Sequence, residues 1–389
     1  MAGERLRDAL AAYRRRYRRA SRAERSRLLD EFCQLTGYHR KYAITLLNRR
    51  HESNSRRRCR GPTYCRKTLE VIEAIWRAAG CPWSVRLKAL IPQWLPWARK
   101  HVDGLTPEVE KEVLSISPRQ IDHRLASKKR RLRRRLYGRT KPGTLLREQV
   151  PIRTHPREVS EPGYTEVDLV SHSGPSARGE FAYSLNLTDI YSGWCESRAV
   201  LGRGQEAVLA ALKDIQASLP FPILAIHSDN GSEFINHHLI RYCQSRGIAM
   251  TRSRPYNKDD NARIEQKNWT HVRRIWGWGR YDRAEEVRAM NDLYKGELRL
   301  MMNLFQPSVK LVAKERRGSR LIRRYEEART PLDRLADHYG PRGLPQAVKE
   351  LLALRRTVDP FELSRTIDRK LRQIEAVRSA RRVKKSGSG

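Results

Sequence analysis

The chain has 389 residues, with 80 lysine and arginine residues against 43 aspartate and glutamate residues, which gives a formal net charge of +37. This length exceeds the roughly 100 to 200 residues of a typical domain, so several domains are expected, and the charge predicts a polyanionic partner, most commonly nucleic acid. No run reaches the roughly 18 apolar residues of a membrane span, which argues against a membrane protein.

The positive charge is concentrated outside the middle of the chain. Residues 1–160 hold 40 basic and 15 acidic residues, residues 161–282 hold 14 of each, and residues 283–389 hold 26 and 14. We therefore expect the DNA affinity to lie in the two flanks rather than in the neutral middle.

The cysteines predict a reducing compartment. None of the six forms a CxxC pair, and the N-terminus is charged where a secretory signal is apolar, so a cytoplasmic protein with structural thiols is expected. His51, Cys59 and Cys65 are zinc-ligand types, but they lack tight spacing and a clear fourth ligand, which favours plain thiols over a zinc site.

Residues 21–50 have the pattern of a helix-turn-helix, and we assign 1–60 as a DNA-binding domain of that type. Apolar residues recur at helical spacing, the pattern breaks at Thr36-Gly37, and it then resumes. A helical hairpin with a solvated basic face explains the segment equally well. The side chains that the second helix would present to a major groove are His39, Arg40, Lys41, Thr45 and Asn48.

A second helical DNA-binding domain is expected over 61–136. Thr106-Pro107 and Ser117-Pro118 each predict a helix start, and the second helix ends in a basic run that indicates phosphate contacts, although such runs are often only solvated tails. The candidate DNA contacts are Arg119, Gln120, Arg124, Lys128, Lys129, Arg130, Arg131, Arg133, Arg134 and Arg135. The tryptophans expected to anchor the core are Trp76, Trp83, Trp94 and Trp97.

A basic, extended linker rich in proline and glycine is expected over 137–160, and a mixed α/β domain over 161–282. Strands are predicted at 164–172, 180–192, 194–201, 222–229 and 248–256, and helices at 204–219, 237–245 and 262–277.

Three carboxylates of this domain are able to converge. Asp168 lies in the first strand, Asp229 ends an apolar strand before an Asn-Gly turn, and Glu265 lies one turn into the last helix, with Asn268 on the same face. Their hard oxygen ligands suit Mg²⁺ or Mn²⁺. Taken singly, Asp229 reads as a turn residue and Glu265 as a surface residue.

The segments TEVDLV, HSDNGSEF and DNARIEQKN together resemble the catalytic core of the DDE superfamily, which comprises bacterial insertion-sequence transposases and retroviral integrases. Between Asp168 and Asp229 there are 60 residues, and between Asp229 and Glu265 there are 35, a spacing typical of that family. The N-terminal stretch also resembles the DNA-binding start of bacterial transposases, and the retroviral zinc-binding pattern is absent.

This resemblance implies a multidomain α plus α/β protein with a central ribonuclease H-like mixed sheet and two Mg²⁺ or Mn²⁺ ions held by the three carboxylates. It implies cleavage at the ends of a mobile element and joining of the 3′-hydroxyls to target DNA, by a homo-oligomer assembled on double-stranded DNA. Relatives often carry Lys or Arg seven residues after the glutamate. That position is Val272 here, so Arg273 is the candidate for the role, and Asn268 is a further candidate for DNA contact.

The basic region 283–389 is expected to add a small DNA-binding β-barrel and a last helix, 360–382, which packs either on a partner subunit or on its own domain. Two other classes share parts of this pattern. A transposase-derived DNA-binding regulator needs the basic helical domains without the three carboxylates, and a lone ribonuclease H-like nuclease needs the core without two helix-turn-helix candidates.

Overall fold

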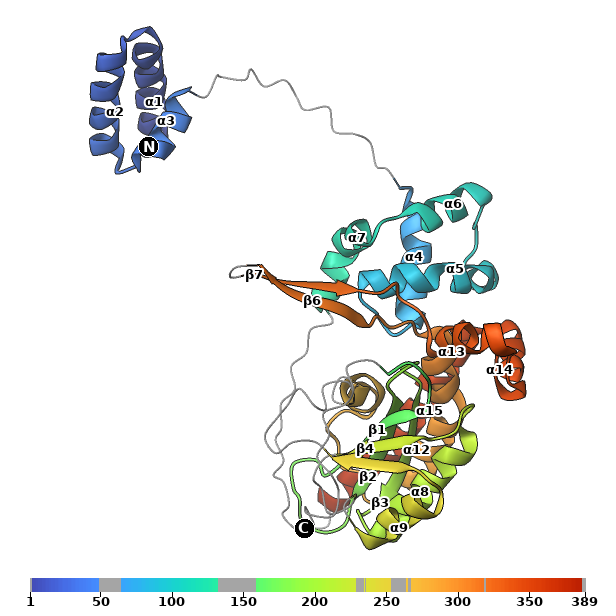
Figure 1. Cartoon of the computed structure of the whole chain (residues 1–389). Coiled ribbons are helices and arrows are strands. Elements are labelled where there is room, and N and C mark those ends of the chain that lie inside the picture. Colours follow the sequence, from blue (N-terminus) through green and yellow to red (C-terminus); the bar gives the residue numbers. More distant parts are fainter. Residues whose placement is uncertain are drawn as a thin grey trace. The chain divides into compact units, whose positions relative to one another are not determined.

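The computed structural model describes residues 2–48, 64–131, 159–228, 234, 236–252, 264, 267–317 and 320–386 (Figure 1). The chain divides into two compact units, residues 1–63 and 64–389. Of the expected linker, 137–160, only the last two residues fall within the described ranges. No helix in those ranges is long and apolar enough to cross a membrane.

The first unit is a bundle of three helices, α1 (Ala2–Arg19), α2 (Arg22–Thr36) and α3 (Arg40–Asn48). The turn between α2 and α3 occurs where the sequence predicts it, and Gly37 adopts φ 69°, a left-handed conformation that glycine accepts without strain. Helix α1 was not predicted. It packs Tyr13 against the fully buried Phe32, with ring centroids 5.3 Å apart.

The second unit begins with four helices, α4 (Arg66–Ala78), α5 (Ser84–His101), α6 (Pro107–Ser115) and α7 (Pro118–Arg131). The predicted starts of α6 and α7 are confirmed, because Thr106 caps Val109 N–H at 3.4 Å and Ser117 Oγ accepts Gln120 N–H at 3.3 Å.

The tryptophans of these helices have different environments. Trp76 and Trp94 are buried as expected, and Trp97 is partly buried against the same core. Trp83 contradicts the prediction, since it occupies the N-cap position before α5 and is 47% exposed. A residue at a helix start projects beyond the first turn, so its size does not guarantee burial.

A five-stranded mixed sheet forms the centre of the second unit, in the order β3-β2-β1-β4-β5. Strand β2 pairs antiparallel with both β1 and β3, while β4 pairs parallel with β1 and β5 pairs parallel with β4. The strands are β1 (Tyr164–Ser171), β2 (Ala182–Asp189), β3 (Cys195–Leu201), β4 (Ala225–Ser228) and β5 (Ala249–Arg252).

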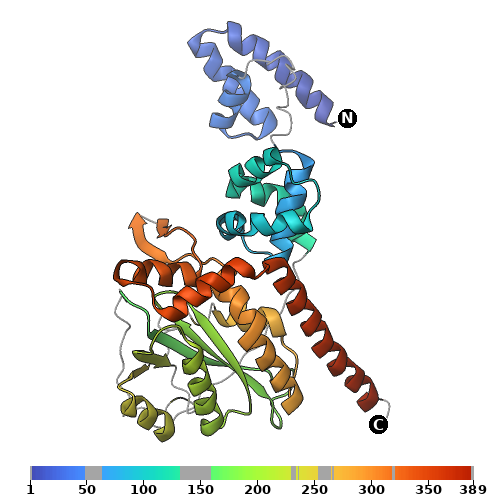
Figure 2. The same ribbon diagram turned by 90° about the vertical axis from the view of Figure 1, so that its right-hand side faces the viewer.

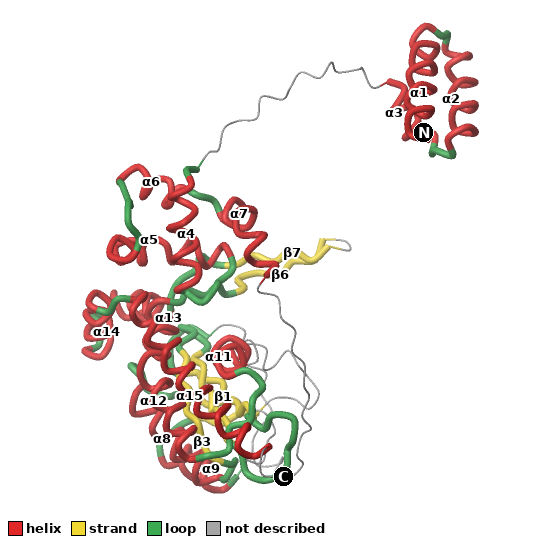
Figure 3. The backbone as a smooth tube through the Cα atoms, turned by 180° about the vertical axis from the view of Figure 1, so that it is seen from behind, coloured by secondary structure: helices red, strands yellow, loops and turns green. Residues whose placement is uncertain are grey.

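Helices cover both faces of this sheet (Figures 1 and 3). On one face, α8 (Gln205–Ser218) and α9 (His237–Ser245) enclose an apolar core that includes Leu187 and Ile226. The other face is covered by a helical chain with three segments of wider, π-helical spacing. Its parts are η2 (Asn268–Arg273), α11 (Arg274–Trp276), α12 (Ala284–Leu293), η3 (Tyr294–Leu298) and η4 (Met301–Phe305).

Two asparagines of this chain close the free edge of β3. Asn291 accepts the N–H of Ala199 at 2.7 Å and donates to its carbonyl at 2.8 Å. Asn303 does the same for Cys195, at 2.9 Å in both directions. Each carboxamide therefore pairs with the backbone as a neighbouring strand would, which satisfies groups that an edge strand otherwise leaves exposed.

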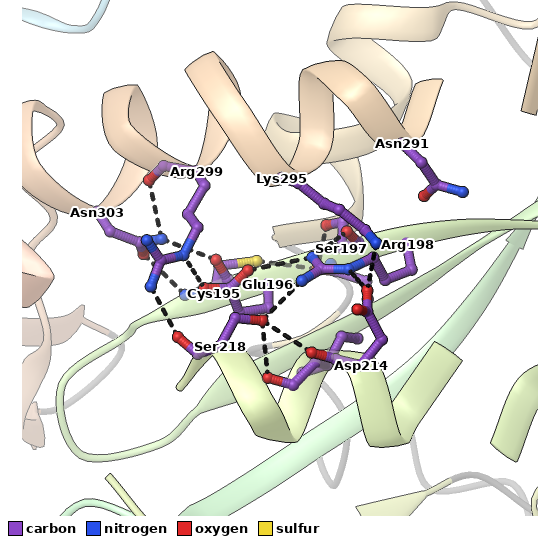
Figure 4. Close-up of polar contacts among 12 residues, drawn as sticks. Cys195, Glu196, Ser197, Arg198, Asp214, Ser218, Asn291, Lys295, Arg299 and Asn303 are labelled. Atoms are coloured by element: carbon purple, nitrogen blue, oxygen red, sulfur yellow. Dashed lines mark hydrogen bonds and ion pairs between the residues drawn. The ribbon is translucent and has the colours of Figure 1, made fainter. Parts of the chain in front are cut away.

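A buried ion network attaches the same helices to β3 (Figure 4). Glu196 accepts hydrogen bonds from Arg299 at 2.7 Å and from Arg198 at 3.2 Å. Arg198 also pairs with Asp214 of α8 at 2.5 Å, and Arg299 donates to the carbonyl of Ser218 at 2.7 Å. The network therefore joins the edge strand to helices on both of its sides.

The C-terminal region differs from the expected β-barrel. Its described strands, β6 (Leu311–Arg317) and β7 (Arg320–Tyr325), pair only with each other, and a two-stranded sheet cannot close into a barrel. The remaining elements are helical: α13 (Pro331–Tyr339), η5 (Gly340–Arg342), α14 (Gln346–Thr357) and α15 (Pro360–Ser386).

Helix α15 packs on its own chain, which resolves the alternative left open by the sequence. Leu363 and Ile367 are buried in the core shared with α4 and α5, and the helix continues beside α12 (Figure 2, dark red). The helical region 64–131 belongs to the same packed unit, since Gln93 donates to the Leu304 carbonyl at 3.1 Å and Gln306 to the Ala79 carbonyl at 2.7 Å.

Candidate active site

Strand β1 is tied at two points to the segment that contains the start of η2. Glu166 and Asp168 alternate along the strand and therefore project to the same face of the sheet. Glu166 is 1% exposed, and its carboxylate accepts the backbone N–H of Ile264 at 2.9 Å. Asp168 is partly buried and accepts the amide of Asn268 at 2.6 Å. These contacts hold the segment at the start of η2 against β1, although the two lie about 100 positions apart in the sequence.

A chain of amides across the sheet orients the Asp168 carboxylate. Asn268 Oδ1 accepts Asn186 Nδ2 at 2.8 Å, and Asn186 is the residue opposite Asp168 in the β1–β2 register. Asn186 Oδ1 in turn accepts the thiol of Cys195 at 2.9 Å. Burial raises the pKa of this thiol to about 11, so it stays protonated and donates at neutral pH. The amide of Asn268 is therefore held with its nitrogen toward Asp168.

Strand β4 ends beside β1 immediately before Asp229. The two strands are parallel, and Val167 is paired with Ser228, the last residue of β4. Asp229 and Glu265 lie outside the described residues, so Asp168 is the one predicted carboxylate whose contacts are known. Across the described ranges, no group of three or more His, Cys, Asp or Glu side chains is placed to hold a metal ion.

Arg273 on η2 carries a positive charge toward Asp168. Val272 is completely buried, so it cannot contact DNA. Arg273 is partly buried and stacks on the ring of Trp278, with its guanidinium carbon 4.1 Å from the ring centroid. Burial lowers the pKa of this guanidinium, and the neighbouring Tyr294 and Asp168 oppose that effect. Turns of π-helical spacing are frequent at functional sites.

Two basic side chains of the same helix point into the protein. Lys267 donates to the Gly193 carbonyl at 3.0 Å, and burial lowers its pKa to about 8. His271 is buried beside Thr270, with its Nδ1 2.7 Å from the hydroxyl, and burial lowers its pKa well below the usual value. Both side chains therefore make their contacts inside the domain.

The predicted groove-facing side chains of α3 are largely exposed. Lys41, Thr45 and Asn48 are exposed and recur on one helical face. Arg40 is engaged within the unit, where it pairs with Asp30. Lys41, Thr45 and Asn48 therefore form the helical face that is available to a partner, and His39, directly before the helix, is exposed as well.

The predicted contacts on α7 fall into three groups. Arg119, Gln120 and Arg124 are exposed. Lys128 pairs with Glu73 and Lys129 pairs with Asp122 at 2.5 Å, so these two lysines are partly neutralised. Arg130 and Arg131 belong to the last turn of α7, but their side chains are not described. Arg133, Arg134 and Arg135 lie outside the described residues.

Two residues of the site were not anticipated from the sequence. Glu166 precedes Asp168 by two positions, so strand alternation could have placed both on one face. Asn186 had no comparable signal, because its role depends on the register between β1 and β2.

Comparison with known proteins gives one family match and one close relative. A family model described as "Integrase core domain" matches residues 159–258. The relative, "Uncharacterized protein y4rM" of Sinorhizobium fredii (strain NBRC 101917 / NGR234), is 39% identical over 321 residues, which are 82% of this chain and 91% of the relative.

Two solved structures are similar to this chain at low identity. The catalytic core domain of BIV integrase matches at 17% identity and a TM-score of 0.31, over 46% of this chain and 98% of that one. The HTLV-2 integrase catalytic core domain, solved in complex with magnesium in a dimeric form, matches at 14% identity and a TM-score of 0.29, over 38% and 90%.

Proposed function

Since the chain belongs to the family of the Sinorhizobium fredii protein y4rM and carries an integrase core domain, we propose that it is a DNA transposase of the DDE type. Its substrates are the terminal repeats of a mobile element and target DNA. The reaction cleaves at the element ends to expose 3′-hydroxyls and joins these hydroxyls to target phosphodiesters.

The arrangement around β1 carries this proposal. Ser228, the last residue of β4, pairs with Val167, and Asp229 and Asp168 are the residues that directly follow this pair in the sequence. Ile264 and Asn268, which flank Glu265 in the sequence, are hydrogen-bonded to Glu166 and Asp168. Asp168, Asp229 and Glu265 are therefore expected at one end of the central strands.

The chemistry of this set fits divalent metal ions. Three carboxylates supply the hard oxygen donors that Mg²⁺ and Mn²⁺ prefer, and Asp168 is partly exposed. Two such ions, when bound by Asp168, Asp229 and Glu265, would supply activation of the attacking oxygen and stabilisation of the leaving oxygen.

The surrounding residues orient and complement this set. Asn268 and Asn186 hold the Asp168 carboxylate in one orientation, which keeps its oxygens directed for coordination. Arg273 places a positive charge where a phosphodiester beside Asp168 would bring a negative one.

DNA recognition is assigned to the basic parts outside the core. The exposed faces of α3 and α7 are the proposed readers of the element ends, in the helix-turn-helix manner. The β6–β7 ribbon adds a further contact in place of the expected barrel. Arg316, Arg323 and Arg324 are exposed on it, and a two-stranded ribbon has the width that the major groove admits.

The active form is proposed to be a homo-oligomer assembled on DNA. Each chain contains one core, whereas insertion of an element joins both of its ends to target DNA. Residues 1–63 form a compact unit of their own, which allows the helix-turn-helix reader to hold one end while the core of the second unit acts on the other. Mixing a catalytically inactive subunit of altered end specificity with an active one, and identifying the end that is cut, tests this action in trans.

The function is tested with Asp168→Asn, Asp229→Asn and Glu265→Gln in the full-length chain. Each is expected to abolish Mg²⁺-dependent cleavage and strand transfer on a plasmid carrying the repeats that flank the gene, while binding to those repeats stays nearly unchanged. Glu285→Gln, an exposed acid outside the set, is the matched control.

Each outcome of this experiment has a definite meaning. Near-normal strand transfer by one of the three variants would show that its residue is misassigned, and Asp259 and Asp260, which lie in the sequence just before Glu265, are the reserve candidates. Specific binding to the repeats without cleavage by the unmodified chain would favour the alternative, a transposase-derived DNA-binding regulator. Footprints of equal strength on repeats and on unrelated DNA would contradict the assignment of end recognition to 1–136.

A further inference from the structure

A pocket of about 560 Å³ lies between α15 and the segment that follows η2. Its volume is in the range of about 300 to 1,000 Å³ that is usual for small-molecule sites. One wall contains the sequence Trp276-Gly277-Trp278-Gly279, and we call this space the WGWG pocket. Gly277 has φ 64° and faces open space, so the absence of a side chain there keeps the pocket clear.

The charge and the rings of this pocket fit a nucleotide. Four arginines line it, Arg273, Arg274, Arg372 and Arg378, against one acid, Glu375. That acid is already engaged by Arg378 at 2.5 Å. Trp269 also lines the pocket and is 51% exposed, although a tryptophan of a folded core is normally covered. Cationic groups beside an exposed aromatic face are the combination that holds a phosphate and a stacked base.

Unused hydrogen-bond donors point to the same class of ligand. Within the described part of the chain, Trp278 Nε1 and the Nε and Nη1 atoms of Arg378 are enclosed without a hydrogen-bond partner. A buried donor without an acceptor is unfavourable until it is paired. Because surrounding atoms cover these donors, an acceptor oxygen such as that of a phosphate reaches them only when the Trp278 and Arg378 side chains shift.

The pocket adjoins the candidate active site. Trp269 directly follows Asn268, whose amide is hydrogen-bonded to Asp168. Arg273 lines the pocket and also stacks on Trp278, which forms part of the same wall. The residue that contacts Asp168 and the first residue that lines the pocket are therefore consecutive on η2.

On the basis of the proposed function, we propose that the WGWG pocket holds one unpaired nucleotide of the DNA strand that is being processed. The base stacks on Trp269 and the phosphate contacts the arginines of α15. Removing a nucleotide from the duplex next to the reacting phosphodiester costs stacking energy, and a preformed aromatic and cationic pocket offsets that cost. No role of this kind is needed for recognition of an intact duplex.

The test compares single-stranded and duplex DNA, with the full-length chain and with chelator in place of metal so that no cleavage occurs. Trp269→Ala is expected to bind labelled oligodeoxythymidine about tenfold more weakly than the unmodified chain, since one base–aromatic stack is worth about 1 to 3 kcal/mol. Its affinity for duplex DNA should stay within about twofold, because phosphate contacts dominate duplex binding. Trp269→Phe, which retains an aromatic ring, should recover most of the single-strand affinity.

Two controls exclude general effects of the substitutions. Trp83→Ala removes a tryptophan of similar exposure, 47%, that does not line the pocket, and it should leave both affinities unchanged. Arg372→Ala should weaken single-strand binding, whereas Arg369→Ala, an exposed arginine of the same helix outside the pocket, should not.

The outcomes separate this inference from the proposed function. Equal losses on single-stranded and duplex DNA, or no loss on either, would overturn the pocket assignment. Thymidine monophosphate binding as tightly as the oligonucleotide would also overturn it and would assign the pocket to a free nucleotide. Cleavage by Asp168→Asn would overturn the proposed function and leave this metal-free binding result untouched.

Discussion

Glu196→Gln tests whether the buried ion network attaches the helical layer to the sheet. The Glu196 side chain is fully buried and accepts three hydrogen bonds, from Trp194 Nε1 at 3.0 Å, Arg299 at 2.7 Å and Arg198 at 3.2 Å. Glutamine has nearly the same volume, but it removes the negative charge and turns an amide toward the arginines. The substitution therefore isolates the electrostatic contribution from packing.

The expected loss in the free energy of unfolding is about 3 kcal/mol. Removing one partner of a buried ion pair typically costs about 3 to 5 kcal/mol, because the remaining charge stays buried. The lower end applies here, since Arg198 keeps Asp214 as a partner. Arg299 is the residue whose buried charge loses its carboxylate partner, because its side chain is only 18% exposed.

The measurement is guanidinium unfolding followed by tryptophan fluorescence, because all eight tryptophans, Trp194 among them, lie in the unit 64–389. Glu206→Gln, an exposed acid at the start of α8, should change stability by no more than about 0.5 kcal/mol. Adding Arg299→Met to Glu196→Gln removes the stranded charge and should restore part of the loss. A loss below about 1 kcal/mol, the range of an exposed pair, would refute the reasoning.

Three further predictions concern stability, strand protection and DNA binding. Burial lowers the pKa of His172 to about 3 from the usual 6.5, so the unfolded chain binds a proton that the folded chain does not. The free energy of unfolding should therefore fall as pH drops from about 6.5 toward 3, and His172→Phe should show a shallower fall in acid titrations of stability. Asn291→Leu should speed amide hydrogen exchange at Ala199, because it removes the carboxamide that pairs with this residue, while exchange in β2 stays unchanged. Lys41→Ala in the full-length chain should weaken binding to the terminal repeat and reduce the log–log salt slope of that binding by about 1, and an unchanged slope would argue against a phosphate contact.

Local patterns in the sequence were sufficient for most of the secondary structure and for the family. The helix starts at Thr106 and Ser117, the turn at Gly37 and all five strands of the central sheet lie where spacing and capping residues place them. The resemblance to an integrase core is confirmed by the family match over 159–258, which contains TEVDLV and HSDNGSEF and ends before DNARIEQKN. These features are readable because each depends on neighbours within a few positions.

Other features depend on which distant segments pack together. The sequence alone left the packing of α15 open and predicted the burial of Trp83 and the C-terminal barrel wrongly. The exposure of Trp83 and the two-stranded ribbon in place of a barrel both follow from how much surface neighbouring elements cover. Helix α15 could have packed on another subunit, and only its contacts with α4, α5 and α12 decide that it packs on its own chain.

The surroundings of Asp168 show the same division most clearly. The sequence by itself placed this carboxylate on a strand of a mixed sheet and predicted its chemistry. The tertiary structure decided that Asn186 lies opposite it, that Asn268 donates to it from about 100 residues away, and that Glu166 anchors the backbone at Ile264. Strand alternation fixes the side of the sheet to which a residue points, but the pairing register and the packing of distant helices determine what it meets there, because these arise from the burial of the whole core.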